Sequence, residues 1–118
     1  MKRKILVVED ESDIADLVKL VLETQNYEVK TVLDSVQAYD TAKQYGPDAI
    51  IVDLRMPRMD GFQAIKLIRD DPETTHIPII AISAWANVKN EKRALELGAN
   101  KCIAKPYELE ELMKAIYT

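Results

Sequence analysis

This chain of 118 residues has few of the residues that build disulfide scaffolds, histidine metal sites or membrane spans. Its single cysteine, Cys102, cannot form a disulfide within the chain, and this usage favours the reducing cytoplasm. Its single histidine, His76, excludes a metal site built from several histidines. The apolar runs are only a few residues long, so we expect no membrane span. No charged-then-apolar leader precedes the acidic residues Glu9 to Glu11, so we predict a cytoplasmic protein.

Charge and size restrict the function further. Asp and Glu outnumber Lys and Arg by 20 to 16, and the net charge of -4 disfavours a nucleic-acid surface. Hydrophobic residues are 47% and charged residues 31% of the chain, as in a folded globular domain rather than a disordered one. On a usual size of roughly 100–200 residues per domain, we expect one domain over residues 1–118, with no room for a separate input or output module.

Short apolar runs alternate with helical patterns along the whole chain. The apolar runs predict buried strands at 5–8, 28–32, 49–52, 78–82 and 101–104. A helical spacing of apolar residues follows each run, and Ser12 and Ser35 are predicted to cap the first two helices. The polar segment 70–76 is typical of a surface connection. This alternation predicts an α/β fold, a doubly wound parallel sheet of five strands with five helices on its two faces.

Ligands of an open parallel α/β sheet bind beyond the carboxyl ends of its strands. The polar residues at those ends are Glu9, Asp10, Asp53, Ser83 and Lys105. Three carboxylates gathered at one edge repel one another, which predicts either a protonated acid or a bound cation. Oxygen ligands without histidine or cysteine favour Mg²⁺ over Zn²⁺.

Among these residues Asp53 is the predicted nucleophile, because it ends an unbroken apolar strand that would hold it rigidly. A carboxylate can attack phosphorus and form an aspartyl phosphate. Successive strand residues point in opposite directions, so Glu9 and Asp10 suit a direct and a water-mediated metal contact. Lys105 offers a positive charge and Ser83 a hydroxyl to phosphate oxygens. This set provides the positioning and charge neutralisation that phosphoryl transfer needs.

The chain resembles the response regulator receiver domain of two-component signalling, which has the CheY-like, flavodoxin-like fold, here as a stand-alone domain. The motifs that carry the resemblance are Val7–Glu11, Ile51–Gly61, Ile82–Ala84 and Lys105–Pro106. The second motif is long and highly specific, and together the motifs span essentially the whole chain. The strand order 2-1-3-4-5 is carried over from this family, because the alternation alone does not fix it.

The resemblance implies that Asp53 accepts a phosphoryl group from a phosphohistidine of a sensor histidine kinase or a histidine phosphotransfer protein. It implies that Mg²⁺ is held by Glu9, Asp10, Asp53 and the backbone carbonyl of Arg55. It also implies that Ser83 and Lys105 bind the incoming phosphoryl oxygens. Phosphorylation would then remodel the surface near the last two helices, where a downstream protein docks.

Two positions invite separate attention. Cys102 lies three residues before Lys105, where the family usually places an aromatic residue that couples the site to the docking surface, so that coupling is expected to differ here. Alternatively, Cys102 is an ordinary small, half-buried strand residue. Trp85, two residues after Ser83, is expected to slow water entry, to contact a partner or simply to pack.

Other functions fit the residues less well. A small-molecule phosphohydrolase needs a second acid near the nucleophile, but Arg55 follows two residues after Asp53. A flavodoxin-like cofactor site needs a glycine-rich or hydroxyl-rich loop after the first strand, and this chain has acids there. A degenerate receiver serving as a scaffold, or a receiver cut from a larger regulator or hybrid kinase, stays open. We therefore predict a signalling phosphoacceptor rather than an enzyme.

Overall fold

The computed structural model describes residues 2–54, 61–83 and 88–117 of the chain. The described residues form strands β1 (Lys4–Val8), β2 (Glu28–Val32), β3 (Ala49–Asp53), β4 (Ile79–Ser83) and β5 (Lys101–Ala104). They also form helices α1 (Ser12–Thr24), α2 (Ser35–Tyr45), α3 (Gly61–Asp70), α4 (Val88–Leu97) and α5 (Leu109–Tyr117).

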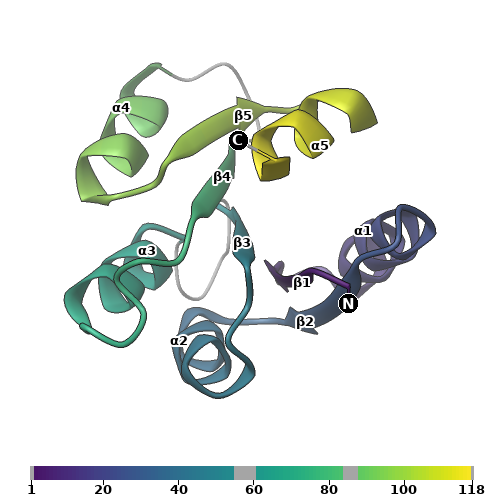
Figure 1. The fold of residues 1–118 in the computed structure, drawn as a ribbon. Coiled ribbons are helices and arrows are strands. Elements are labelled where there is room, and N and C mark those ends of the chain that lie inside the picture. The colour runs from purple at the N-terminus through teal and green to yellow at the C-terminus, as the bar shows by residue number, and fades with distance from the viewer. Residues whose placement is uncertain (1, 55–60, 84–87, 118) are drawn as a thin grey trace.

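All five strands are parallel and form one sheet in the order β2-β1-β3-β4-β5 (Figure 1). The predicted α/β class and the strand order 2-1-3-4-5 are both confirmed. β3 lies at the centre of the sheet, and its register pairs Asp53 with Ile82 of β4. In turn, Ser83 at the end of β4 pairs with Ala104 of β5. The register therefore brings the ends of the last three strands to one edge.

The helices cover both faces of the sheet. Helices α1 and α5 lie on one face, and α2, α3 and α4 lie on the other (Figure 1). Because side chains alternate along a strand, β1 sends Ile5 and Val7 into one core and Leu6 and Val8 into the other. Strands buried on both faces are consistent with the continuous apolar runs of the sequence. In the described part of the chain, no helix combines the length and apolarity needed to cross a membrane.

The two predicted N-caps each lie one residue too late. Glu11 is the N-cap of α1, and its side chain makes no capping hydrogen bond. Asp34 caps α2, where its Oδ1 accepts the Gln37 N–H at 2.8 Å. Ser35 is therefore the first helical residue, and it is fully buried. Both Asp and Ser are good caps, so a sequence with the two side by side does not decide between them.

The polar segment 70–76 is a largely exposed connection between α3 and β4, as predicted, but it also makes structural contacts. Thr74 is fully buried, and its hydroxyl donates to the carbonyl oxygen of Ile68 at 2.6 Å. Asp71 accepts a hydrogen bond from the Tyr39 hydroxyl and forms an ion pair with Lys43 at 3.2 Å. The segment thus ties the end of α3 to α2.

Candidate functional site

Asp53 lies at the carboxyl end of the central strand, where its backbone is tightly fixed. All five residues of β3 are buried, and Asp53 itself is 6% exposed. The Leu54 N–H donates to the carbonyl oxygen of Ile82 at 2.9 Å, which extends the sheet past the aspartate. A Cβ atom at Gly61 would lie 2.5 Å from the Asp53 carbonyl oxygen, so only glycine lets α3 begin this close to β3. The position of Asp53 is therefore set by strand and helix together.

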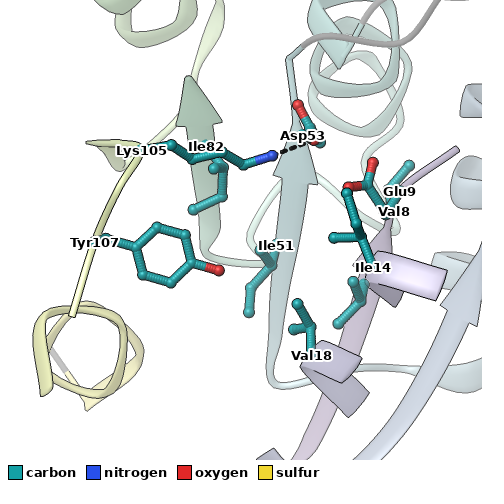
Figure 2. A pocket seen from close by; sticks show the side chains of 10 residues that line it. Val8, Glu9, Ile14, Val18, Ile51, Asp53, Ile82, Lys105 and Tyr107 are labelled. Carbon is teal, nitrogen blue, oxygen red and sulfur yellow. Dashed lines mark hydrogen bonds and ion pairs between the residues drawn. The ribbon is translucent and has the colours of Figure 1, made fainter. Parts of the chain in front are cut away.

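The side chain of Lys105 points toward Asp53 at the carboxyl edge of the sheet (Figure 2). Its Nζ lies 3.0 Å from Asp53 Oδ2. The Lys105 N–H donates to the carbonyl oxygen of Ser83 at 2.8 Å, so the ends of β4 and β5 stay together. Burial lowers the pKa of Lys105, but the hydrogen bond and charge of Asp53 outweigh it and raise that pKa. Lys105 is thus a cation held in place at the acid edge.

Glu9 adds a second buried carboxyl group to this edge. It is 4% exposed, and its backbone N–H donates to the carbonyl oxygen of Val32 at 3.0 Å. Within the described residues, its buried Oε2 has no hydrogen-bond partner. Burial, and then the negative charge of Asp53, raise the pKa of Glu9 to about 8, and contact with Asp10 adds to this rise. Without a cation, the Glu9 carboxyl therefore favours its protonated form at neutral pH.

These side chains line one small pocket at the sheet edge. The pocket has about 20 Å³ of space open to the centre of a water molecule. Figure 2 shows Glu9, Asp53 and Lys105 around it, with apolar side chains such as Ile51 below them. Tyr107 also lines the pocket, with its hydroxyl directed inward, and burial raises its pKa. Tyr107 was not among the predicted site residues. Its only signal in the sequence is its position two residues after Lys105.

The structure brings most of the predicted site residues together. Asp53, Lys105 and Glu9 share the pocket, Ser83 is 4% exposed at the end of the adjacent strand, and Asp10 is half-buried beside Glu9.

Two of the predicted positions, Arg55 and Trp85, lie outside the described residues. Among the residues that are described, no three His, Cys, Asp or Glu side chains gather as ligands of one metal ion. The two carboxyl groups that line the pocket among the described residues are those of Glu9 and Asp53.

Cys102 is half-buried in β5 and lies away from this pocket. It lines a wider groove between α4, β5 and α5, of about 540 Å³. Burial, and then the charge of Glu91, raise the pKa of its thiol. This position agrees with the prediction that Cys102 is an ordinary half-buried strand residue.

A parallel sheet in this order, with a buried aspartate facing a lysine at its carboxyl edge, defines a doubly wound α/β domain whose functional site lies at the carboxyl ends of its strands. The sequence model of the response regulator receiver domain family matches residues 5–117. The chain therefore belongs to this family and is a phospho-accepting module of two-component signalling.

Individual relatives agree with this assignment. The polar-differentiation response regulator DivK of Brucella anthropi is 30% identical over 116 residues, which cover 98% of this chain and 94% of DivK. The DNA-binding dual master transcriptional regulator RpaA of Synechocystis is 31% identical over 113 residues, and the match spans 96% of this chain but only 47% of RpaA. Relatives of both lengths therefore contain this domain.

A solved structure of a receiver domain has the same fold. The receiver domain of the sensor histidine kinase PA1611 from Pseudomonas aeruginosa matches with a TM-score of 0.89 and 33% identity, over 98% of this chain and 95% of that one. That receiver domain was crystallised with a magnesium ion coordinated in its active site cleft.

Proposed function

We propose that Asp53 is the residue that accepts the phosphoryl group. The observation that carries this proposal is the 3.0 Å contact between Asp53 Oδ2 and Lys105 Nζ at the end of the central strand. A carboxylate at this position is rigid and buried. The lysine paired with it can also interact with a phosphoryl oxygen once the phosphoryl group is attached. In the reaction, a carboxylate oxygen of Asp53 forms a bond to phosphorus as the bond from phosphorus to the donor nitrogen breaks.

The residues at this edge also fit Mg²⁺. Glu9 has a buried oxygen without a hydrogen-bond partner in the described chain, and its pKa is raised first by burial and then by the negative charge of Asp53. An oxygen-only set with one or two carboxylates and room for waters is what Mg²⁺ prefers. We propose Glu9, Asp53 and, through water, Asp10 as its ligands, with the Arg55 carbonyl as a further one. Bound Mg²⁺ would neutralise the acids and the charge of the phosphoryl group.

Ser83 and Lys105 would hold the product. Lys105 already lies at the aspartate, and its positive charge suits a phosphoryl oxygen. Ser83 is fixed at the end of β4 through its carbonyl oxygen, which accepts the Lys105 N–H. New hydrogen bonds from both residues to a phosphoryl oxygen would favour one arrangement of the two strand ends over another.

We propose separate surfaces for the phosphodonor and the downstream protein. Helix α1 begins three residues after Glu9 and exposes Leu17 and Leu20 by 60% and 61%, as expected for contact with an apolar partner helix. A sensor histidine kinase or a histidine phosphotransfer protein would dock there. The groove between α4, β5 and α5 would receive the downstream protein. The module would act in the cytoplasm, on its own aspartate and on no separate substrate.

The test compares chemical and protein phosphodonors. With Mg²⁺ and acetyl phosphate, or with beryllofluoride, the fluorescence of Trp85, the one tryptophan of the sequence, should change. Asp53→Asn should abolish this response, whereas Asp40→Asn, an exposed carboxylate on α2, should preserve it. An equal response from wild type and Asp53→Asn would exclude Asp53 as the acceptor. A domain that binds partners without ever responding to a phosphodonor would instead be a scaffold.

A further inference from the structure

Tyr107 places a polar group in the pocket that the proposed function does not use. Figure 2 shows its hydroxyl directed into the pocket from the side of β5, while Glu9 enters from the side of β1. The ring of Tyr107 packs against the core under α1 and α5, and a phenylalanine ring could make the same contacts. The hydroxyl group is therefore an addition that packing does not require.

The surroundings of this hydroxyl are mostly apolar. Ile14 and Val18 of α1 and Ile51 of β3 line the pocket with it. Burial makes the largest contribution to the raised pKa of Tyr107. A tyrosine hydroxyl in such surroundings usually finds a hydrogen-bond partner, because leaving it without one costs free energy. The partner has to come from the polar groups of the pocket.

Glu9 carries the group that suits this hydroxyl best. Its Oε2 is buried and has no hydrogen-bond partner within the part of the chain that the structure describes. The two other charged residues of the pocket, Asp53 and Lys105, are paired with each other at 3.0 Å. The pocket thus combines a hydroxyl group on one side with an acceptor that lacks a described partner on the other.

The space in the pocket suits water. The pocket offers about 20 Å³ to the centre of a water molecule, and roughly 10–15 Å³ is enough to hold one. One water molecule, or two in sequence, would therefore fit. A water-mediated hydrogen bond is enthalpically nearly as good as a direct one. The Tyr107 hydroxyl can donate to such a water, which can donate in turn to Glu9 Oε2.

A hydrogen bond donated to Oε2 would orient the carboxyl group of Glu9. A carboxylate with one oxygen held in this way presents its other oxygen to a cation in a fixed direction. The carboxyl group of Glu9 also interacts with Asp53 and Asp10, the other acids of this edge. Loss of a group that hydrogen-bonds a metal ligand from outside typically costs about 10- to 100-fold in metal affinity. A group that acts through water should have a smaller effect.

We propose that Tyr107 is a positioning residue for the Mg²⁺ ligand Glu9 and that it acts through one or two ordered water molecules in the pocket. The proposal rests on the Mg²⁺ site proposed above. It assigns a role to a hydroxyl group that contacts neither the metal nor the phosphoryl group. Phenylalanine at this position would keep the packing of the ring and lose the water bridge.

Crystal structures of the metal-free protein test the water bridge. In wild type we expect one or two ordered waters that form an unbroken hydrogen-bonded path from Tyr107 Oη to Glu9 Oε2. In Tyr107→Phe this path should be absent, with the phenylalanine ring in the position of the tyrosine ring. A wild-type pocket in which no water links the two groups would overturn the proposal.

Titration with Mg²⁺, followed by the backbone amide signals of Glu9 and Asp53 in NMR spectra, tests the effect on the metal. Tyr107→Phe should bind Mg²⁺ about 3- to 10-fold more weakly than wild type. Tyr45→Phe is the matched control, because it also loses a hydroxyl, which donates to Glu28 at 2.7 Å at the opposite end of the sheet. This control should bind Mg²⁺ as wild type does. Equal affinities in wild type and Tyr107→Phe would refute the positioning role.

A double-mutant cycle shows whether Tyr107 acts through Glu9. Methionine is about as long as glutamate but has no carboxylate, so Glu9→Met removes both the metal ligand and the acceptor of the bridge. Adding Tyr107→Phe to Glu9→Met should change the Mg²⁺ affinity by less than about 2-fold. A further loss of about 3- to 10-fold in that background would show that Tyr107 acts without Glu9, which contradicts the proposal.

Failure of the proposed metal site would give a different result. If Mg²⁺ shifts none of these amide signals in wild type, the metal site is wrong and the positioning role of Tyr107 falls with it. If Mg²⁺ binds wild type and Tyr107→Phe equally well, the metal site stands and only the role of Tyr107 is refuted.

Discussion

Replacing Glu9 by glutamine should stabilise the metal-free domain at neutral and alkaline pH. The pKa of Glu9 is raised from 4.5 to about 8 in the folded protein, first by burial and then by the charge of Asp53. The folded state therefore keeps a proton that the unfolded state releases, and stability falls as pH rises between these two values. Glutamine is nearly isosteric and has no proton to lose, so it removes this pH dependence.

The size of the effect follows from the two pKa values. One pKa unit corresponds to about 1.4 kcal/mol, so the Glu9 carboxyl should destabilise the folded state by about 3 kcal/mol at pH 7, and by nearly 5 kcal/mol above pH 8. At pH 4 the cost should vanish, because the carboxyl is then protonated in both states. Glu9 is 4% exposed, so solvent screening reduces this figure little.

The assay is urea unfolding of wild type and Glu9→Gln in EDTA at a series of pH values. Taking the difference between the two proteins cancels the titration of the groups that do not interact with Glu9. We expect the advantage of Glu9→Gln to grow from near zero at pH 4 to about 3 kcal/mol at pH 7, and to shrink when Mg²⁺ is added. A difference that stays within about 0.5 kcal/mol across this range would show that Glu9 is not a strained buried acid.

Four further variants test the site, the fold around it and the docking surface. Gly61→Ala should cost about 1–3 kcal/mol or more in urea unfolding and also slow phosphorylation by acetyl phosphate, because its Cβ would meet the backbone of β3. Gly46→Ala, at a φ of +62° in open space, should cost about 1–2 kcal/mol and leave phosphorylation intact; equal kinetics for both variants would contradict this. Arg69 donates hydrogen bonds to the carbonyl oxygens of Gly98 and Ile77 and to Asn100 Oδ1, and lysine cannot reproduce all of them. Arg69→Lys should therefore lose about 2–4 kcal/mol of stability, and an unchanged unfolding midpoint would show that these hydrogen bonds are dispensable. Replacing Leu17 and Leu20 together by serine should slow phosphotransfer from a phosphohistidine protein about tenfold while sparing acetyl phosphate; an equal loss with both donors would argue against a docking role.

The elements of the fold could be predicted because their signals are local. Apolar runs such as Ala49 to Val52 are buried on both faces, and their short length and β-branched residues distinguish them from helices. The strand order could not be worked out this way, because pairing depends on contacts between distant segments, and it came from the family resemblance. Small offsets at element ends have local causes: Pro78 lacks an N–H, and β4 begins at Ile79.

The residues of the candidate site were predictable, but their energetics were not. The rule that ligands bind at the carboxyl ends of parallel strands located Asp53 and Lys105. The 3.0 Å contact between them, and the burial that raises the pKa of Glu9, depend on side-chain packing. The hydrogen bonds that Arg69 donates could not be predicted from the sequence, because most of their acceptors are backbone carbonyl oxygens, which any residue supplies. Tyr107 was missed because its neighbours, rather than its spacing, bring it to the pocket.

The most direct test of the account is to locate the phosphoryl group after reaction with acetyl phosphate and Mg²⁺. Intact-mass measurement would count the groups added, and reductive trapping with borohydride followed by peptide mapping would identify the acceptor. We expect one acid-stable, base-labile acyl phosphate per chain, located at Asp53 and absent from Asp53→Asn. Modification of another residue in wild type, or an undiminished yield in Asp53→Asn, would contradict it.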